Sequence, residues 1–91
     1  MTFVWDEEKR KANLRRHGLD FADVEQVFEN ELVTDIDDRF DYGETRYYTL
    51  GILESFVVVV SHTEEDEVIR VISFRKAEKN EEEIYYKNIR N

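Results

Sequence analysis

Residues 45–75, TRYYTLGILESFVVVVSHTEEDEVIRVISFR, decide the fold. Three runs rich in β-branched and aromatic residues follow one another here, over 45–53, 56–63 and 68–75. Such runs are typical of β-strands, and the segments that join them are short and polar. Because short connections favour antiparallel neighbours, this stretch predicts a three-stranded antiparallel meander.

Two helices are predicted before the meander. Asp6 is a typical helix N-cap, and Gly18 supplies the left-handed residue that commonly ends a helix, so the first helix should run to about His17. Asp20 begins a second helix in the same way. The apolar residues after Asp20 recur at helical spacing until about residues 29–30.

The remaining segments complete an α+β order. Residues 32–36 predict a fourth strand, residues 37–44 form a polar loop, and the short apolar opening at 3–5 suits a strand. A helix rich in Glu and Lys should follow from Lys76. Its expected apolar contacts are Ile84, Tyr85 and Ile89. We therefore expect a single α+β domain over residues 1–91, with an antiparallel sheet of about four strands, two N-terminal helices and a C-terminal helix.

The composition excludes several classes of protein. A hydrophobic content of 41% and an aromatic content of 13% are typical of a folded chain. Cysteine is absent, which excludes disulfides and thiolate zinc sites. The two histidines lack metal-ligand spacing, so no metal or other cofactor is expected. With no signal peptide or membrane span in the sequence, we expect a cytoplasmic protein without a membrane partner.

Charge is segregated along the chain. The net charge is −9, which alone argues against nucleic-acid binding. However, residues 9–16 and 68–77 are basic and free of acids, whereas residues 20–44 carry ten acids. Two interpretations remain open. The segregated charges either form solvated faces that keep the domain soluble or mark a basic groove.

Basic side chains lie on the predicted strands among large apolar residues. Arg46, His62 and Arg70 each share a strand face with such residues, as expected if helices cover one side of the sheet and a ligand groove lies on the other. Histidine is also suited to proton transfer near neutral pH. The other interpretation is that Arg46 and Arg70 lie at strand ends and pair with Glu44 or Glu64.

The first helix carries a polar stripe at three- and four-residue steps. Its members are Trp5, Lys9, Asn13 and Arg16. This stripe either lines a groove or partner surface, or is a solvent face anchored by Trp5. Arg10 and Lys11 are expected on the solvent side of this helix, and His17 is suited to its C-terminal dipole.

Three blocks of sequence together resemble one known family. The first is Trp5-Asp6-x-x-Lys9-x-x-x-Asn13 followed by His17-Gly18, and the second is Gly43-Glu44-x-Arg46. The third combines His62-Thr63-Glu64 with the run from Arg70 to Ala77. The chain resembles the BrnT family of ribonuclease toxins across nearly its whole length.

This resemblance implies a RelE-like fold and a ribonuclease that blocks translation. It also implies a BrnA-type antitoxin with a DNA-binding part, assembled with the toxin as a heterotetramer that represses its own operon. Operator DNA would be contacted only through the antitoxin. An alternative from another class is a catalytically weak module that mainly holds the antitoxin as a co-repressor. The acidic net charge favours this alternative, because it repels RNA and attracts a basic partner.

Metal-free RNA cleavage needs cations for the phosphate, a base and an acid. Arg70 and Arg75 are suited to the first role. His62, Glu64 or His17 could move the proton, and the sequence leaves the choice open. The expected substrate contacts are Lys9, Asn13, His17, Arg46 and Lys76. Because Arg70 and Arg75 are five residues apart, they share a face only if Arg75 leaves the pleat or a bulge shifts the register, as we predict.

Overall fold

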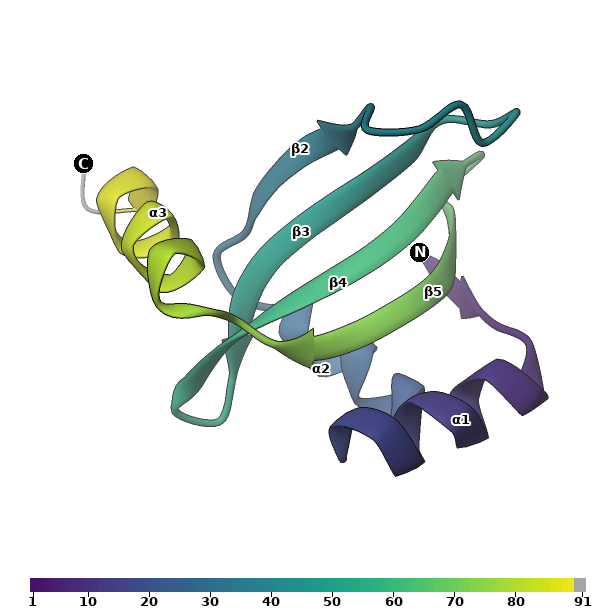
Figure 1. Ribbon diagram of the computed structural model, residues 1–91, viewed down its shortest axis with the longest axis horizontal. Helices are drawn as coiled ribbons and strands as arrows, with labels where there is room; N and C mark the ends of the chain where they lie inside the picture. The colour runs from purple at the N-terminus through teal and green to yellow at the C-terminus, as the bar shows by residue number, and fades with distance from the viewer. Residues whose placement is uncertain (90–91) are drawn as a thin grey trace.

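The computed structural model describes residues 1–89, so the last two residues of the domain expected over 1–91 lie outside the described part. The fold is mixed α+β, with a five-stranded sheet in the order β1-β5-β4-β3-β2 (Figure 1). The elements are β1 (Thr2–Val4), α1 (Glu7–His17), the 3-10 turn η1 (Phe21–Asp23), α2 (Val24–Val27), β2 (Val33–Asp37), β3 (Arg46–Leu53), β4 (Phe56–Glu65), β5 (Val68–Lys76) and α3 (Lys79–Ile89). The predicted α+β class and the antiparallel meander of β3, β4 and β5 are confirmed.

The sheet has one strand more than the four expected. The additional strand, β1, pairs in parallel with β5, from Thr2 opposite Val68 to Val4 opposite Arg70. The sequence showed only a short apolar opening at residues 3–5, because a three-residue strand is too short to display a period. Its partner is also far along the chain, so no turn signal announces the pairing.

The helices follow their caps but differ in length from the prediction. The Asp6 side chain accepts a hydrogen bond from the Lys9 backbone N at 3.0 Å, and Gly18 ends α1 with a φ of 73°. Asp20 caps η1 rather than a longer α-helix, and α2 ends at Val27 instead of residues 29–30. The final helix begins at Lys79 rather than Lys76, because β5 continues through Lys76.

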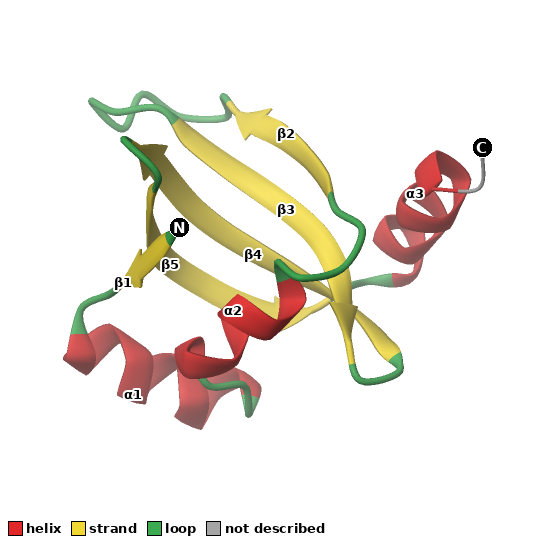
Figure 2. Ribbon diagram, turned by 180° about the vertical axis from the view of Figure 1, so that it is seen from behind, coloured by secondary structure: helices red, strands yellow, loops and turns green. Residues whose placement is uncertain are grey.

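One face of the sheet is covered by η1 and α2. Phe21, Val24 and Val27 are fully buried there, together with Val58 and Val60 of β4. The helix α1 runs beside β5, as the two opposite views show (Figures 1 and 2). This packing forms the larger part of the core, and it fixes which face of each strand is turned away from η1 and α2.

The opposite face is covered only at one end, by α3. Tyr85 is 1% exposed and packs against Leu50, Val57 and Val59. Ile84, which was expected to make an apolar contact, is instead 47% exposed, so the buried side of α3 is narrower than predicted. The rest of this face, which we call the open face, is left to polar side chains. Within residues 1–89, no helix is long and apolar enough to cross a membrane.

Candidate active site

A β-bulge in β5 determines which side chains reach the open face. The register shifts between Ser61 and His62 of β4, and Ile72 of β5 is left as an extra residue. The core residues of β5 point to the helix side both before and after the bulge: Ile69, Val71 and Phe74. Arg70 and Arg75 therefore both point to the open face, although five residues separate them. Of the two predicted ways to share a face, the structure shows the bulge; Arg75 does not leave the pleat, because β5 continues through Lys76.

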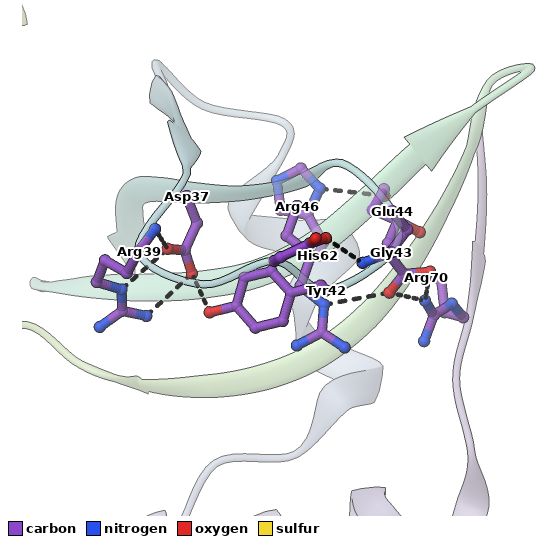
Figure 3. Close-up of polar contacts among 10 residues, drawn as sticks. Asp37, Arg39, Tyr42, Gly43, Glu44, Arg46, His62 and Arg70 are labelled. Atoms are coloured by element: carbon purple, nitrogen blue, oxygen red, sulfur yellow. Dashed lines mark hydrogen bonds and ion pairs between the residues drawn. The ribbon is translucent and has the colours of Figure 1, made fainter.

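At one end of the open face, a single carboxylate joins two arginines from different strands. Glu44 accepts hydrogen bonds from Arg70 Nη2 at 2.7 and 2.8 Å and from Arg46 Nε at 3.1 Å (Figure 3). Hydrogen bonds from Arg70 and then Arg46 hold the pKa of Glu44 below its usual range. This finding confirms the interpretation in which both arginines pair with Glu44. We call this group the Glu44 cluster.

The loop between β2 and β3 lies next to the Glu44 cluster and is organised by a buried acid. The Asp37 carboxylate accepts from Arg39 Nε and Nη2, both at 2.9 Å, and from the Tyr42 hydroxyl at 3.2 Å. Its side chain is only 5% exposed, and the bonds from Arg39 lower the pKa of Asp37 to about 2. The Tyr42 ring lies 4.0 Å from the Arg46 guanidinium, so the loop is tied to the Glu44 cluster (Figure 3).

The other end of the open face is a groove beside α3. Its volume is about 740 Å³, and Asp35 of β2, Tyr48 of β3, Ser61 of β4 and Arg75 of β5 line it together with α3. Arg75 makes two hydrogen bonds of 2.9 Å to Glu81 of α3. This ion pair fastens the start of α3 to the sheet, and it leaves the Arg75 side chain 34% exposed.

His17 is the last residue of α1. The half-buried ring stands at the end of α1, where burial, then Arg16, then Arg75 lower its pKa. His17 is placed by α1 beside β5, and its lowered pKa favours the neutral imidazole.

His62 lies on the other face. Its ring is 1% exposed, stacks on Tyr47 and meets Phe28 edge-on, in contact with the core under α2. Its Nε2 lies 2.7 Å from Thr49 Oγ1, and its Nδ1 lies 3.2 Å from the Thr63 carbonyl oxygen, to which it donates. Burial lowers the pKa of His62. In this position a neutral, hydrogen-bonded ring supports the core and does not face the arginines.

Asn13 also has a place in the packing rather than on the open face. It is 8% exposed, and its Nδ2 donates to the Leu19 carbonyl at 3.1 Å and to the Phe74 carbonyl at 2.8 Å. Its Oδ1 accepts from the Phe74 backbone N at 3.1 Å. β1 pairs with β5 only at residues 68–70. Further along the same strand, at Phe74, the Asn13 amide makes the backbone hydrogen bonds that a neighbouring strand would otherwise make.

The other predicted residues are not gathered at the arginines. Lys76 lies over the Phe56 ring at 4.7 Å, and Glu64 is exposed near the end of β4, opposite Ile69. Lys9 is exposed on α1. Arg10 was expected on the solvent side of α1, but it is partly buried between Glu7 and Asp20. This correction follows from the Asp20 cap, which brings a carboxylate to the side of α1.

Sequence reasoning missed three members of the site. Glu44 was considered only as an ion-pair partner, and Arg39 and Glu81 were not singled out. Strand alternation cannot place a loop or a helix against a sheet face, so it gave no signal for these residues. The available signal for such ion pairs was that carboxylates stand next to the strand ends, in a chain whose net charge is −9. Within residues 1–89, no group of three or more His, Cys, Asp or Glu side chains lies together as a metal-binding group would.

Fold and site together define a class. The chain is a small α+β protein whose partly covered sheet presents arginines on its open face, an arrangement suited to binding an anionic ligand. The sequence model of one family, described as the BrnT ribonuclease toxin of type II toxin–antitoxin systems, matches residues 5–81. The chain therefore belongs to the BrnT family of ribonuclease toxins, and membership of a type II system implies an antitoxin partner. No curated protein matches the chain significantly.

Proposed function

We propose that this chain is an endoribonuclease that cleaves RNA on the open face of its sheet without a metal ion. The observation that carries the proposal is the bulge at Ile72, which brings Arg70 and Arg75 to the same face. At roughly 3.3 Å per residue, five residues of a strand span about 16 Å. The two guanidinium groups are therefore suited to different phosphates of one RNA strand rather than to a single phosphate.

The arginines of this face are paired with carboxylates, which the phosphates of a bound RNA would have to displace. Arg70 and its partner Glu44 are 40% and 37% exposed, and Arg75 and its partner Glu81 are 34% and 21% exposed. Ion pairs open to solvent contribute little net free energy, so a phosphate can displace a carboxylate at low cost. The guanidinium forks then bind phosphate oxygens with the same bidentate geometry.

The reaction needs two proton transfers. The ribose 2′-hydroxyl loses its proton to a base and attacks phosphorus, the bond from phosphorus to the 5′-oxygen breaks, and an acid protonates that oxygen. Glu44 adjoins both Arg70 and Arg46, so its carboxylate is the best-placed base for a phosphate bound by these two arginines, and water at this solvent-open end can protonate the 5′-oxygen. Arg70 and Arg46 would stabilise the charge that develops on the oxygens of the reacting phosphate, and Arg75 would bind another phosphate of the same strand.

Cleavage of a structured RNA by purified variants tests this proposal. We expect Arg70→Ala to lower the rate about 30- to 1000-fold, the range for loss of one preorganised charge-stabilising donor, and Arg75→Ala to lower it less, through weaker RNA binding. Lys11→Ala is the matched control, because Lys11 is half-exposed and makes only one long contact, of 3.8 Å, to Glu8. Equal small losses in all three variants would show that the cations attract RNA only diffusely. Complete loss of activity in excess EDTA, restored by magnesium, would refute the metal-free mechanism.

The cellular role that we propose follows from family membership. A RelE-like toxin of this kind would act in the cytoplasm as one domain over residues 1–91, where cutting RNA blocks translation. A BrnA-type antitoxin with a DNA-binding part would neutralise it in a heterotetramer that represses the operon, and the toxin would reach operator DNA only through that partner. Co-expression with the adjacent reading frame followed by size-exclusion chromatography tests the complex. Two separately eluting proteins would contradict it.

A second candidate function is supported by the charge of the chain. The net charge is −9, and each arginine that we place on the open face or its loop is already bound to an acid. A catalytically weak module that mainly holds a basic antitoxin as a co-repressor would have these properties. Expression without the antitoxin separates the two functions, since growth arrest is expected from the ribonuclease and continued growth from the partner-binding module.

A further inference from the structure

The loop between β2 and β3 presents an aromatic ring to solvent beside the arginines. Phe40 is 67% exposed, and its ring meets the Tyr42 ring edge-on, with the centroids 5.8 Å apart at 71°. Tyr42 in turn lies over Arg46, a member of the Glu44 cluster. The guanidinium of Arg39 lies 6.0 Å from the centroid of the Phe40 ring. The two rings, which contact each other, therefore lie between the guanidinium groups of Arg39 and Arg46.

Hydrogen bonds to a buried carboxylate hold this loop in place. The Asp37 carboxylate accepts hydrogen bonds from the side chains of Arg39 and Tyr42, which precede and follow the pair Phe40-Asp41 in the sequence. Further along, Gly43 adopts a φ of 72°, and its backbone N donates to the Asp41 carboxylate at 3.0 Å. The ring of Phe40 is thus presented on an ordered loop, which reduces the entropy that a ligand would lose on contact.

We propose that Phe40 is a stacking site for one unpaired base of single-stranded RNA, next to the phosphates bound by Arg46 and Arg70. This inference rests on the proposed ribonuclease function and assigns it a base-binding position. Proteins that bind single strands combine a cationic path for the backbone with aromatic rings on which bases stack. Asp38 and Asp41 flank the ring along the chain and repel phosphate, so the backbone stays on the arginine side while the base reaches Phe40.

Binding of a probe that cannot be cleaved tests the stacking site separately from catalysis. The probe is a short 2′-O-methyl oligoadenylate with a 5′-fluorescein, in which methylation blocks the attacking hydroxyl, and its Kd is measured by fluorescence anisotropy. We expect Phe40→Ala to raise the Kd about tenfold, within the range for one base stacked on an aromatic side chain. Phe40→Trp should retain affinity, because it keeps an aromatic face, and Phe40→Leu should bind as weakly as Phe40→Ala.

Two controls make the result specific. Tyr86→Ala removes another exposed aromatic side chain, 42% exposed on α3, and should leave the Kd unchanged. A probe of the same length without bases should bind wild-type protein and Phe40→Ala equally, because only a base can stack. A tenfold loss on this probe as well would overturn the proposal, since the substitution would then act through the loop structure or the charges.

Other outcomes separate this inference from the proposed function. If Phe40→Ala binds the probe like wild type while Arg70→Ala binds it more weakly, the stacking site is refuted and the ribonuclease assignment stands. If the wild-type protein neither binds the probe nor cleaves RNA, both are refuted. If Phe40→Ala keeps its RNA affinity but no longer co-elutes with the antitoxin, the ring is a protein contact, and the proposal is overturned.

Discussion

Replacing Asn13 by alanine should destabilise the fold more than any change to the arginines of the open face. The substitution removes three hydrogen bonds of 2.8–3.1 Å from a side chain that is 8% exposed. It leaves the Leu19 carbonyl and both backbone polar groups of Phe74 without these partners. A buried backbone group left unsatisfied costs about 1–3 kcal/mol. Because Asn13 is 8% exposed rather than fully buried, we take the lower end and expect a loss of about 3–4 kcal/mol.

That loss is large beside a total unfolding free energy of about 5–15 kcal/mol for a small domain. Urea denaturation followed by far-UV circular dichroism measures it. Asn88→Ala is the matched control, because Asn88 is exposed and, among residues 1–89, its side chain makes one local bond, of 2.7 Å to the Ile84 carbonyl on α3. We expect a change of no more than about 0.5 kcal/mol there.

The substitution Asn13→Asp sharpens the test. The aspartate keeps an oxygen that can accept from the Phe74 backbone N, but it has no donor for the Leu19 and Phe74 carbonyls and places a negative charge near them. It should therefore destabilise at least as much as Asn13→Ala. A loss below about 1 kcal/mol in both variants, together with weakened RNA binding, would refute the structural role and restore Asn13 as a substrate contact.

Three further changes test other parts of the fold. Burial lowers the pKa of His62 and His17 in the folded protein, so the unfolded chain binds protons at a higher pH than the folded one does. The unfolding free energy should therefore decrease as the pH falls below about 6.5, by at most about 1.4 kcal/mol per pH unit for each histidine. His62→Gln should make the slope between pH 7.5 and 5.5 shallower, and an unchanged slope would contradict this account. Gly51→Ala would place a Cβ 2.6 Å from Val27 Cγ1, so thermal unfolding should show a decrease of about 1–3 kcal/mol in the unfolding free energy. A variant as stable as wild type would mean that α2 packs less closely on β3. Tyr85→Phe removes a 2.9 Å hydrogen bond to the Glu31 carbonyl and should lower the unfolding free energy measured in urea by about 1 kcal/mol. An unchanged value would mean that water satisfies that carbonyl in place of the hydroxyl.

Local rules predicted the parts of the fold that depend on neighbours in sequence. Asp6 and Gly18 begin and end α1 as expected, because caps act over three or four residues. The three strands of the meander also lie within one or two residues of their predicted bounds. β1 was not counted in the sheet, because its pairing with β5 depends on a partner more than sixty residues away.

The candidate site was predictable only in part. The sequence singled out Arg70 and Arg75, and the requirement that they share a face predicted either a bulge or a departure of Arg75 from the pleat; the register of β4 and β5 contains the bulge. The sequence could not place His62, because alternation groups side chains by face but does not say which face the helices cover. The partners Glu44 and Glu81 come from a loop and a helix, whose positions follow from tertiary packing.

The pairing of β1 with β5 has a consequence for how the protein is made. Synthesis runs from the N-terminus, so β1 and α1 leave the ribosome well before β5, on which both of them depend. Contacts across so many residues raise the contact order and slow folding. The strand that carries both arginines is also the strand that completes the sheet. A chain whose synthesis stops before β5 therefore has neither a complete sheet nor the two arginines. The chain gains its fold and its cationic face in the same late step.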